Sequence, residues 1–162
     1  MPDNTLERSV MSGKIDKLLQ NRTVVYFDSS PIIYFIEEHP SYVACVQELF
    51  RRVDAGLLSA FSSYITLIEV LIKPLEKKAY DIARAYRDLL ADTPGFSLYP
   101  VERTVSEKAA ELRARYGAKN LKTPDAIQIA TALSFGAELF VTNDADLKRV
   151  KEIDVVTLND FN

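Results

Sequence analysis

Short apolar runs alternate along the chain with longer segments whose apolar residues recur at helical spacing. Residues 23–27 are β-branched and aromatic, which is typical of a buried strand. Further strands are predicted at residues 57–61, 96–100, 138–141 and 154–158. Helices are predicted at residues 30–40, 41–55, 62–74, 75–91, 104–117, 123–136 and 144–150. Strands that alternate with helices indicate a parallel sheet between helical layers.

Capping residues and prolines predict where several helices begin or end. Ser30 and Pro31 are expected to open the first core helix, with serine as the cap and proline at its first position. Thr104 and Glu107 have the spacing of a capping box. Pro74 is expected to interrupt the helix that precedes it.

Residues 1–22 are mostly polar and have only a weak helical pattern, so we expect an appended helix or a loosely held arm. The rest of the chain, residues 23–162, is expected to form one domain. The predicted fold class is α/β, a single domain whose mostly parallel central sheet of four to five strands is flanked by helices.

Length, composition and charge restrict the size of the domain, its expected location and the way it could contact nucleic acid. The chain has 162 residues, of which 48% are hydrophobic, enough for one domain with a sizeable core. Its single cysteine excludes an intramolecular disulfide, and no apolar run is long enough to cross a bilayer. Residues 1–22 lack the apolar middle of a signal peptide, so a cytoplasmic location is expected. The formal net charge of -3 means that any contact with nucleic acid must rest on local cations or bound metal ions.

Four acidic residues lie at the edges of apolar segments: Asp28, Glu69, Asp125 and Asp144. Each has an ordinary structural explanation, because three of them suit helix caps or first turns and Glu69 suits a solvent-facing stripe with Lys73. In an open parallel sheet, however, residues that follow strands or open helices meet at the carboxyl edge. The topology therefore predicts that the four acids share one rim, where carboxylates repel each other unless a cation binds.

The cation that suits the four carboxylates is Mg²⁺ or Mn²⁺, because both ions prefer oxygen ligands. With one histidine and one cysteine, the usual zinc ligand sets are not available. His39 lies beside a proline in a predicted loop and Cys45 on an apolar helix face, so neither is expected to be catalytic. Lys119 and Lys122 precede Asp125 and are candidate phosphate contacts, or else solvated loop lysines.

The four acidic motifs together carry a family resemblance. They are Asp28-Ser29-Ser30, Thr66-Leu67-Ile68-Glu69-Val70, the segment 123–130 (Thr-Pro-Asp-Ala-Ile-Gln-Ile-Ala) and Thr142-Asn143-Asp144. In this order and spacing they resemble PIN-domain proteins, most of all the VapC-type toxins of bacterial and archaeal toxin–antitoxin pairs. The resemblance covers about residues 23–158, and the arm before it is longer than the family usually shows.

The resemblance implies a metal-dependent ribonuclease, and it implies roles for particular residues. Asp28, Glu69, Asp125 and Asp144 match the family's acidic quartet, with Asp28, Asp125 and Asp144 holding the metal and Glu69 acting as a ligand or as orienter of the attacking water. Asp146 matches a position that is often acidic and supports the metal site. Ser30 and Thr142 match hydroxyl residues that orient the acids. An antitoxin partner and a homodimer are also implied.

Two other functions fit parts of the pattern. A non-catalytic module that binds RNA or protein would have the same fold, although pure binding does not require four mutually repelling acids. An aspartyl-phosphate phosphatase would use Asp28 as its nucleophile, but such enzymes usually have a second aspartate two residues later, where this chain has Ser30.

Overall fold

Five strands form one sheet in which every neighbouring pair is parallel. The computed structural model describes residues 4–161. The strands are β1 (Val24–Phe27), β2 (Ser59–Ser63), β3 (Phe96–Tyr99), β4 (Leu139–Thr142) and β5 (Val155–Thr157). Their order across the sheet is β3-β2-β1-β4-β5. The predicted α/β class with a parallel sheet is confirmed, with five strands.

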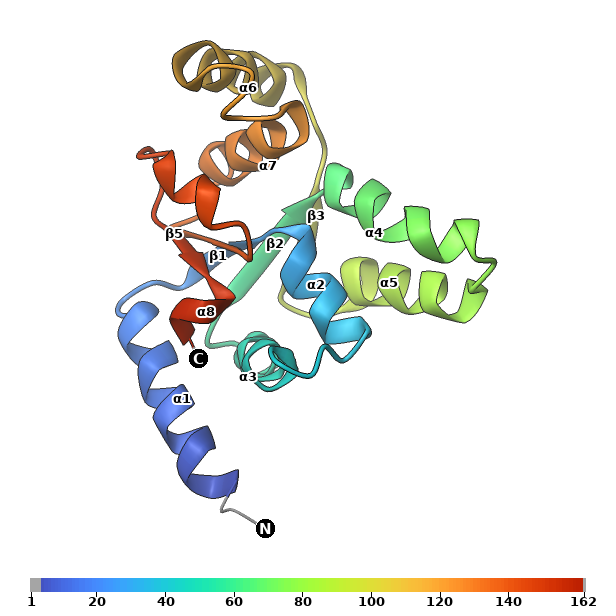
Figure 1. Ribbon diagram of the computed structural model, residues 1–162, viewed down its shortest axis with the longest axis vertical. Coiled ribbons are helices and arrows are strands. Elements are labelled where there is room, and N and C mark those ends of the chain that lie inside the picture. The colour runs from blue at the N-terminus through green and yellow to red at the C-terminus, as the bar shows by residue number, and fades with distance from the viewer. Residues whose placement is uncertain (1–3, 162) are drawn as a thin grey trace.

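Helices cover both faces of the sheet (Figure 1). One layer contains α1 (Asn4–Leu18), α2 (Ser29–Ile36), α3 (Val43–Asp54), α4 (Tyr64–Glu76), α5 (Tyr80–Asp92) and α8 (Leu158–Phe161). The other contains α6 (Arg103–Tyr116), α7 (Thr123–Ser134) and the 3-10 turn η1 (Ala145–Arg149). None of the helices within residues 4–161 is both long and apolar enough to cross a membrane.

The alternation of side chains along β1 explains why there are two apolar cores. Val25 and Phe27 belong to the core beneath α2 to α5, and Tyr26 belongs to the core beneath α6 and α7. All three are fully buried. A strand that is covered on both faces has no polar side, which is why this segment has a continuous apolar sequence.

The strand order places a crevice beside β1. The chain leaves β1 for β2 and β3 on one side and later returns to β4 and β5 on the other, so the order reverses at β1. Val25 pairs with Ala60 of β2 and with Leu139 of β4. Ligands of open parallel sheets bind at the carboxyl ends of the strands on either side of such a reversal.

Two predicted helix starts are wrong. Helix α2 begins at Ser29, and the side chain of Asp28, not that of Ser30, caps it by accepting from the Ser29 N–H. Helix α6 begins at Arg103, so Thr104 lies inside it and no capping box forms. An aspartate directly after a strand competes effectively for the cap position because its carboxylate also complements the helix dipole.

Pro74 does not interrupt its helix. Helix α4 continues through Pro74 to Glu76. The proline stands in the last turn, where its missing N–H removes a single hydrogen bond. The break comes just afterwards, where Lys78 adopts a positive φ and the Ala79 N–H donates to the Pro74 carbonyl.

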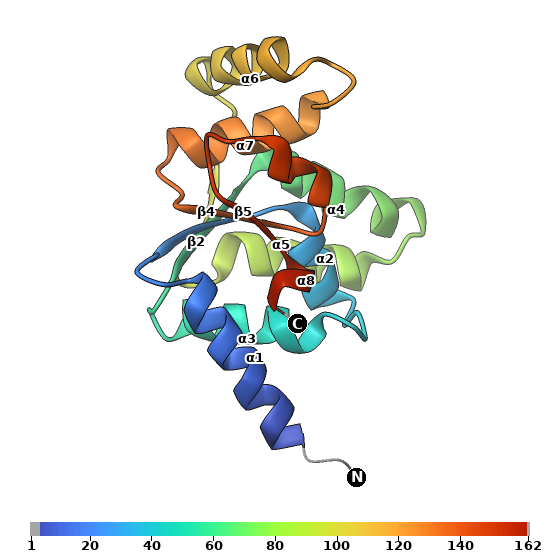
Figure 2. The same ribbon diagram turned by 60° about the vertical axis from the view of Figure 1, so that its left-hand side comes forward.

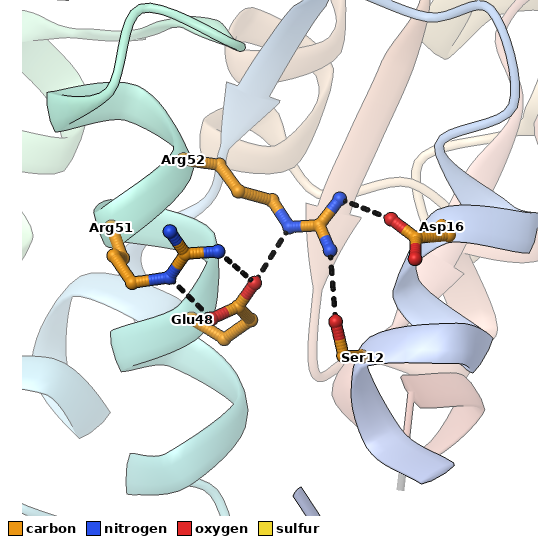
Figure 3. Close-up of polar contacts among 5 residues, drawn as sticks. All are labelled: Ser12, Asp16, Glu48, Arg51 and Arg52. Atoms are coloured by element: carbon orange, nitrogen blue, oxygen red, sulfur yellow. Dashed lines mark hydrogen bonds and ion pairs between the residues drawn. The ribbon is translucent and has the colours of Figure 1, made fainter. Parts of the chain in front are cut away.

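The N-terminal segment is a helix whose C-terminal half packs on the domain. Helix α1 lies against α3 and α8, and its other end projects from the body of the molecule (Figure 2). Ile15 is fully buried, whereas Leu6 and Val10 are exposed. Arg52 of α3 bridges to α1 through an ion pair with Asp16, with an N–O separation of 2.7 Å (Figure 3). The domain boundary near residue 22 stays a prediction.

Candidate functional site

A pocket of about 580 Å³ opens at the carboxyl end of the sheet, and the four predicted acids all line it. Asp28 follows β1 and Asp144 follows β4, the two strands beside the reversal of strand order. Glu69 comes from the second turn of α4, and Asp125 from the first turn of α7. The other lining residues are Ser29, Ser30, Ile33, Tyr34, Lys73, Gln128 and Asn143.

Two of the acids have structural and pocket roles at once. Asp28 caps α2, and Asp144 caps η1 by accepting from the Asp146 N–H. The capping explanation of each residue is therefore correct, and it does not compete with the functional one. Capping consumes one carboxylate oxygen of each residue and also fixes its direction.

Thr142 links Asp28 to Asp144. Its hydroxyl donates to Asp28 Oδ2 at 2.6 Å and accepts from the Asp144 backbone N–H at 3.0 Å. The Ser29 N–H donates to Asp28 Oδ1 at 2.7 Å, so both oxygens of Asp28 are held. Thr142 itself is fully buried. A threonine at this position therefore fixes two neighbouring acids relative to each other.

Ser30 acts on the same loop from the other side. Its hydroxyl accepts from the Asn143 backbone N–H at 2.9 Å, which ties the start of α2 to the segment that carries Asp144. The Asn143 amide also donates to the Tyr34 hydroxyl at 3.1 Å. Ser30 thus holds the loop, and its hydroxyl makes no hydrogen bond to an acidic side chain of the part of the chain that the structure describes.

Glu69 is fixed through one of its two oxygens. Its Oε2 accepts hydrogen bonds from the Ser29 hydroxyl and from Gln128 Nε2, the latter at 2.9 Å. The stripe expected to face solvent around Glu69 and Lys73 would continue at helical spacing through Thr66 and Ser62, but Thr66 of α4 and Ser62 of β2 are both fully buried, so no such stripe forms there. Glu69 Oε1 accepts no hydrogen bond from the described residues, and it is therefore available to a ligand.

The pocket raises the pKa of three of its acids. Burial is the largest cause for Asp28, and the nearby charge of Asp144 adds to it, while hydrogen bonds, that from Thr142 above all, oppose the rise. Burial also raises the pKa of Asp125 and of Glu69, and for both the charge of Asp28 adds to the effect. Burial and the repulsion between neighbouring carboxylates therefore both oppose the ionised state of these three acids.

Within residues 4–161, no ion pair includes any of the four acids. The charge of Lys122 lowers the pKa of Asp125, but burial and the repulsion from Asp28 and Asp144 outweigh it. No three acidic, histidine or cysteine side chains of the described chain form a ready-made metal cage. Because Mg²⁺ usually keeps several waters and binds one or two carboxylates, a pocket lined by four carboxylates fits such an ion.

Some predicted site residues lie elsewhere. Asp146 does not line the pocket, and its carboxylate, 80% exposed, pairs with Arg149. Lys119 and Lys122 are exposed and do not line it either. The lysine that does line the pocket is Lys73, one turn after Glu69. The metal role of Asp146 and the phosphate role of the two loop lysines stay predictions.

Sequence reasoning missed Ser29, Gln128 and Lys73. Gln128 had a visible signal, since it is a polar residue inside the apolar segment 126–130 of a helix. Its side chain is 1% exposed. Lys73 was visible only as a partner for Glu69 at i, i+4, and its place in the pocket depends on how α4 is rotated against the sheet.

Comparison with known proteins agrees with this architecture. The family model described as "PIN domain" matches residues 25–153, most of the chain. The protein therefore belongs to the PIN domain family. A comparison with curated protein sequences gives no significant match.

Solved structures of toxin–antitoxin complexes share the fold. VapBC2 from Rickettsia felis, bound to a DNA fragment from its promoter, superposes with a TM-score of 0.68 at 17% identity, over 83% of this chain and 98% of the other. DNA-bound VapBC from Salmonella typhimurium gives 0.67 at 18%, over 84% and 98%. A toxin–antitoxin complex from Klebsiella pneumoniae gives 0.62 at 24%, over 83% and 97%. At these identities the likeness establishes the fold alone.

Proposed function

We propose that this PIN-domain protein is a Mg²⁺- or Mn²⁺-dependent ribonuclease and the toxin of a toxin–antitoxin pair. The observation that carries the proposal is the set of four carboxylates that line one pocket, none of which forms an ion pair within residues 4–161. A purely structural role does not explain this arrangement, because repulsion and burial both oppose the ionised state. A bound divalent cation supplies the missing positive charge.

Asp28, Asp125 and Asp144 would hold the ion, one or two of them directly and the rest through its waters, with Glu69 as a further ligand or as the group that orients the attacking water. When bound, Mg²⁺ or Mn²⁺ activates a water and stabilises the charge that develops on the phosphate and the leaving oxygen. Asp125 is the least constrained of the four, since its carboxylate accepts no hydrogen bond from the described residues. Asp28 is the most constrained, because Ser29 and Thr142 hold one oxygen each.

The reaction is hydrolysis of a phosphodiester bond. The oxygen of water bonds to phosphorus, the bond from phosphorus to the 3′ oxygen breaks, and the departing oxygen gains a proton. The products have a 5′-phosphate and a 3′-hydroxyl, as the family resemblance implies. The chain's contribution is to fix the carboxylates beforehand, because reacting groups held in place avoid the entropy cost of assembly.

Lys73 is the candidate contact to the substrate backbone. It lines the pocket and forms no ion pair with the described acids. An ammonium group on a flexible stem suits a phosphate next to the scissile one. In a chain with a formal net charge of -3, such a local cation has to offset the repulsion between the protein and RNA.

An exposed apolar stripe on α4 supports a protein partner. Tyr64, Ile68, Ile72 and Leu75 follow one another at helical spacing and are 43–58% exposed. Exposed apolar patches of this kind mark interaction surfaces. Because Glu69 and Lys73 are on the same helix, an antitoxin bound to the stripe would extend to the pocket and block it, and homodimerisation would use a further surface.

Cleavage of RNA by the purified protein tests the catalytic part of the proposal. We expect single-stranded RNA to be cut with Mg²⁺ or Mn²⁺ and to stay intact with a chelator. The Asp28→Asn variant should be inactive while it keeps the fold by circular dichroism. Cleavage that survives chelation, or Asp28→Asn activity at the wild-type rate, would contradict the metal-dependent assignment.

Co-expression tests the toxin part separately. The protein encoded immediately upstream should copurify with the wild-type chain and suppress its toxicity in the host cell. Ile72→Asp should weaken that complex, since it places a charge in the centre of the stripe, whereas the exposed Asp81→Asn on α5 should not. An active nuclease that neither harms the cell nor binds the neighbouring protein would be a PIN nuclease with another role.

A further inference from the structure

Gln128 is the most heavily bonded polar side chain at the base of the pocket, and nothing in the acidic quartet accounts for it. It lies one turn after Asp125 on α7 and is 1% exposed. Burying an amide is unfavourable unless both its donor and its acceptor find partners. The amide oxygen and the amide nitrogen of Gln128 both find hydrogen-bond partners, and these partners lie on opposite sides of the amide.

The acceptor side faces two hydroxyls. Gln128 Oε1 accepts from the Tyr26 hydroxyl at 3.1 Å and from the Thr66 hydroxyl at 3.0 Å. Burial raises the pKa of Tyr26, so its hydroxyl stays protonated and able to donate. The Tyr26 and Ser63 hydroxyls are also in contact, at 3.0 Å, so the amide oxygen is attached to residues of β1 and β2 as well as α4.

The donor side faces the acids. Gln128 Nε2 donates to Glu69 Oε2 at 2.9 Å and lies 3.5 Å from the Ser29 hydroxyl, which bonds to the same carboxylate oxygen. The Gln128 amide can satisfy these partners in one orientation only. Its oxygen must face the hydroxyls of Tyr26 and Thr66, and its nitrogen must face the Glu69 carboxylate. A carboxylate in this position could not donate to Glu69, and an apolar residue could do neither.

We infer that Gln128 is a positioning residue, which holds Glu69 by Oε2 so that Oε1 points toward the ion and the attacking water. This rests on the proposed metal-dependent cleavage. Residues that orient the groups around a metal typically change affinity or activity about 10–100-fold when they are replaced. The rigid sheet transmits the restraint, because the amide is anchored to β1 through Tyr26.

The matched variants are Gln128→Met and Thr131→Val. Methionine keeps the length of the side chain but removes both hydrogen-bonding groups. Thr131 is also fully buried on α7, but among residues 4–161 its hydroxyl bonds only to the Ile127 carbonyl of its own helix. Gln128→Met should lower kcat for RNA cleavage by about 10–100-fold with KM unchanged, and Thr131→Val should change neither.

A double variant isolates the route through Glu69. In a Glu69→Gln background, Gln128→Met should cause a smaller further loss than in the wild type, because the main group it positions has already been replaced and only its weaker effect on Asp28 remains. NMR supplies a readout without turnover. During a Mg²⁺ titration the Gln128 side-chain amide resonance should shift further in the wild type than in Glu69→Gln, and the Gln47 amide should not shift in either.

The outcomes are distinguishable. If the wild type cuts RNA and Gln128→Met does so with the same kcat, the positioning role is wrong. It is also wrong if the double variant loses the full additional factor. If the wild type neither binds Mg²⁺ nor cuts RNA, the proposed function itself fails. Should Gln128→Met not fold, Gln128→Asn replaces it, because the shorter amide cannot reach both sides at once.

Discussion

An acidic side chain has a lowered pKa in one region of this molecule, the contact between α1 and α3, whereas acidic side chains have raised pKa values in another, the pocket. In the contact between α1 and α3, the Glu48 carboxylate accepts hydrogen bonds from Arg51 and Arg52, and Arg52 also pairs with Asp16 (Figure 3). The hydrogen bond from Arg51 lowers the pKa of the Glu48 carboxyl. In the pocket, burial and neighbouring acids raise the pKa of Asp28, Glu69 and Asp125.

The difference separates charges that support the fold from charges that await a ligand. The α1–α3 group is complete, because its acids and its cations lie within the same chain. The pocket group is incomplete, since neither Lys73 in its lining nor Lys122 nearby forms an ion pair with one of its acids within the described residues. The balance of charge around each acid therefore distinguishes the two regions better than residue type does.

The largest expected effect is on activity in the pocket. Asp125→Asn should reduce RNA cleavage about a thousandfold, since the metal contributes several kcal/mol to the transition state. It should also raise the free energy of unfolding of the metal-free protein, because one repelling charge is removed. Single-turnover kinetics and urea unfolding in a chelator measure the two effects. A destabilised and inactive variant would show only that Asp125 supports the fold.

Arg52→Met in the α1–α3 contact should have the reverse effect, a loss of stability without a loss of activity. It leaves the partly buried Glu48 with fewer partners and disconnects α3 from Asp16, so we expect a loss of about 1–2 kcal/mol in the free energy of unfolding. The cleavage rate should stay at the wild-type value. The exposed Arg51→Met is the matched control, with a smaller loss. If Arg52→Met abolished cleavage without unfolding the protein, the two regions would be coupled.

The pH dependence of stability should reveal the pocket acids. A carboxyl whose pKa rises on folding, from an ordinary value of 3.8 or 4.5, stabilises the folded protein at low pH. That contribution is lost as the pH rises through the folded pKa. The metal-free protein should therefore unfold more easily at pH 7 than at about pH 5, and added Mn²⁺ at pH 7 should remove the difference.

Glu48 acts in a separate pH range with the opposite sign. Its folded pKa lies below 4.5, so its contribution is present above that value and is lost as the pH falls through the folded pKa. Thermal unfolding with a chelator should show a maximum of stability on the acidic side of neutrality. A curve for Asp28→Asn with the same rise between pH 7 and about 5 would contradict the assignment to the pocket.

The smallest effect is expected at Lys73. Lys73→Ala should raise KM for RNA about three- to tenfold with little change in kcat, since a phosphate contact contributes to substrate binding alone. The effect should shrink as the salt concentration rises. Lys119→Ala, at an exposed lysine outside the pocket, is the comparison that decides which cation meets the substrate.

Much of the fold was predictable because its signals are local. The apolar run at β1, the glycine after α6 and the Thr123-Pro124 start of α7 each act over a few residues. The errors arose where two local signals compete, as at Ser30, which lost the cap of α2 to Asp28. Helix α8 was not predicted, since its four residues are too short for a helical period.

The acids of the site were predictable for a topological reason, but their supports were not. Strand–helix alternation alone puts Asp28 and Asp144 at one edge of the sheet. The contact between Gln128 and Glu69 joins residues 59 positions apart, on helices whose relative rotation no local pattern fixes. Asp146 shows that proximity in sequence is not enough either, because it lies two residues from Asp144 and still does not line the pocket.

Calorimetric titration of Mn²⁺ into the metal-free protein at neutral pH tests most directly whether the unpaired acids form a cation site. Wild type and Arg52→Met should show the same saturable binding, and Asp125→Asn should bind at least about tenfold more weakly. Absence of saturable binding to the wild type, or equal affinity in Asp125→Asn, would contradict a metal site in this pocket.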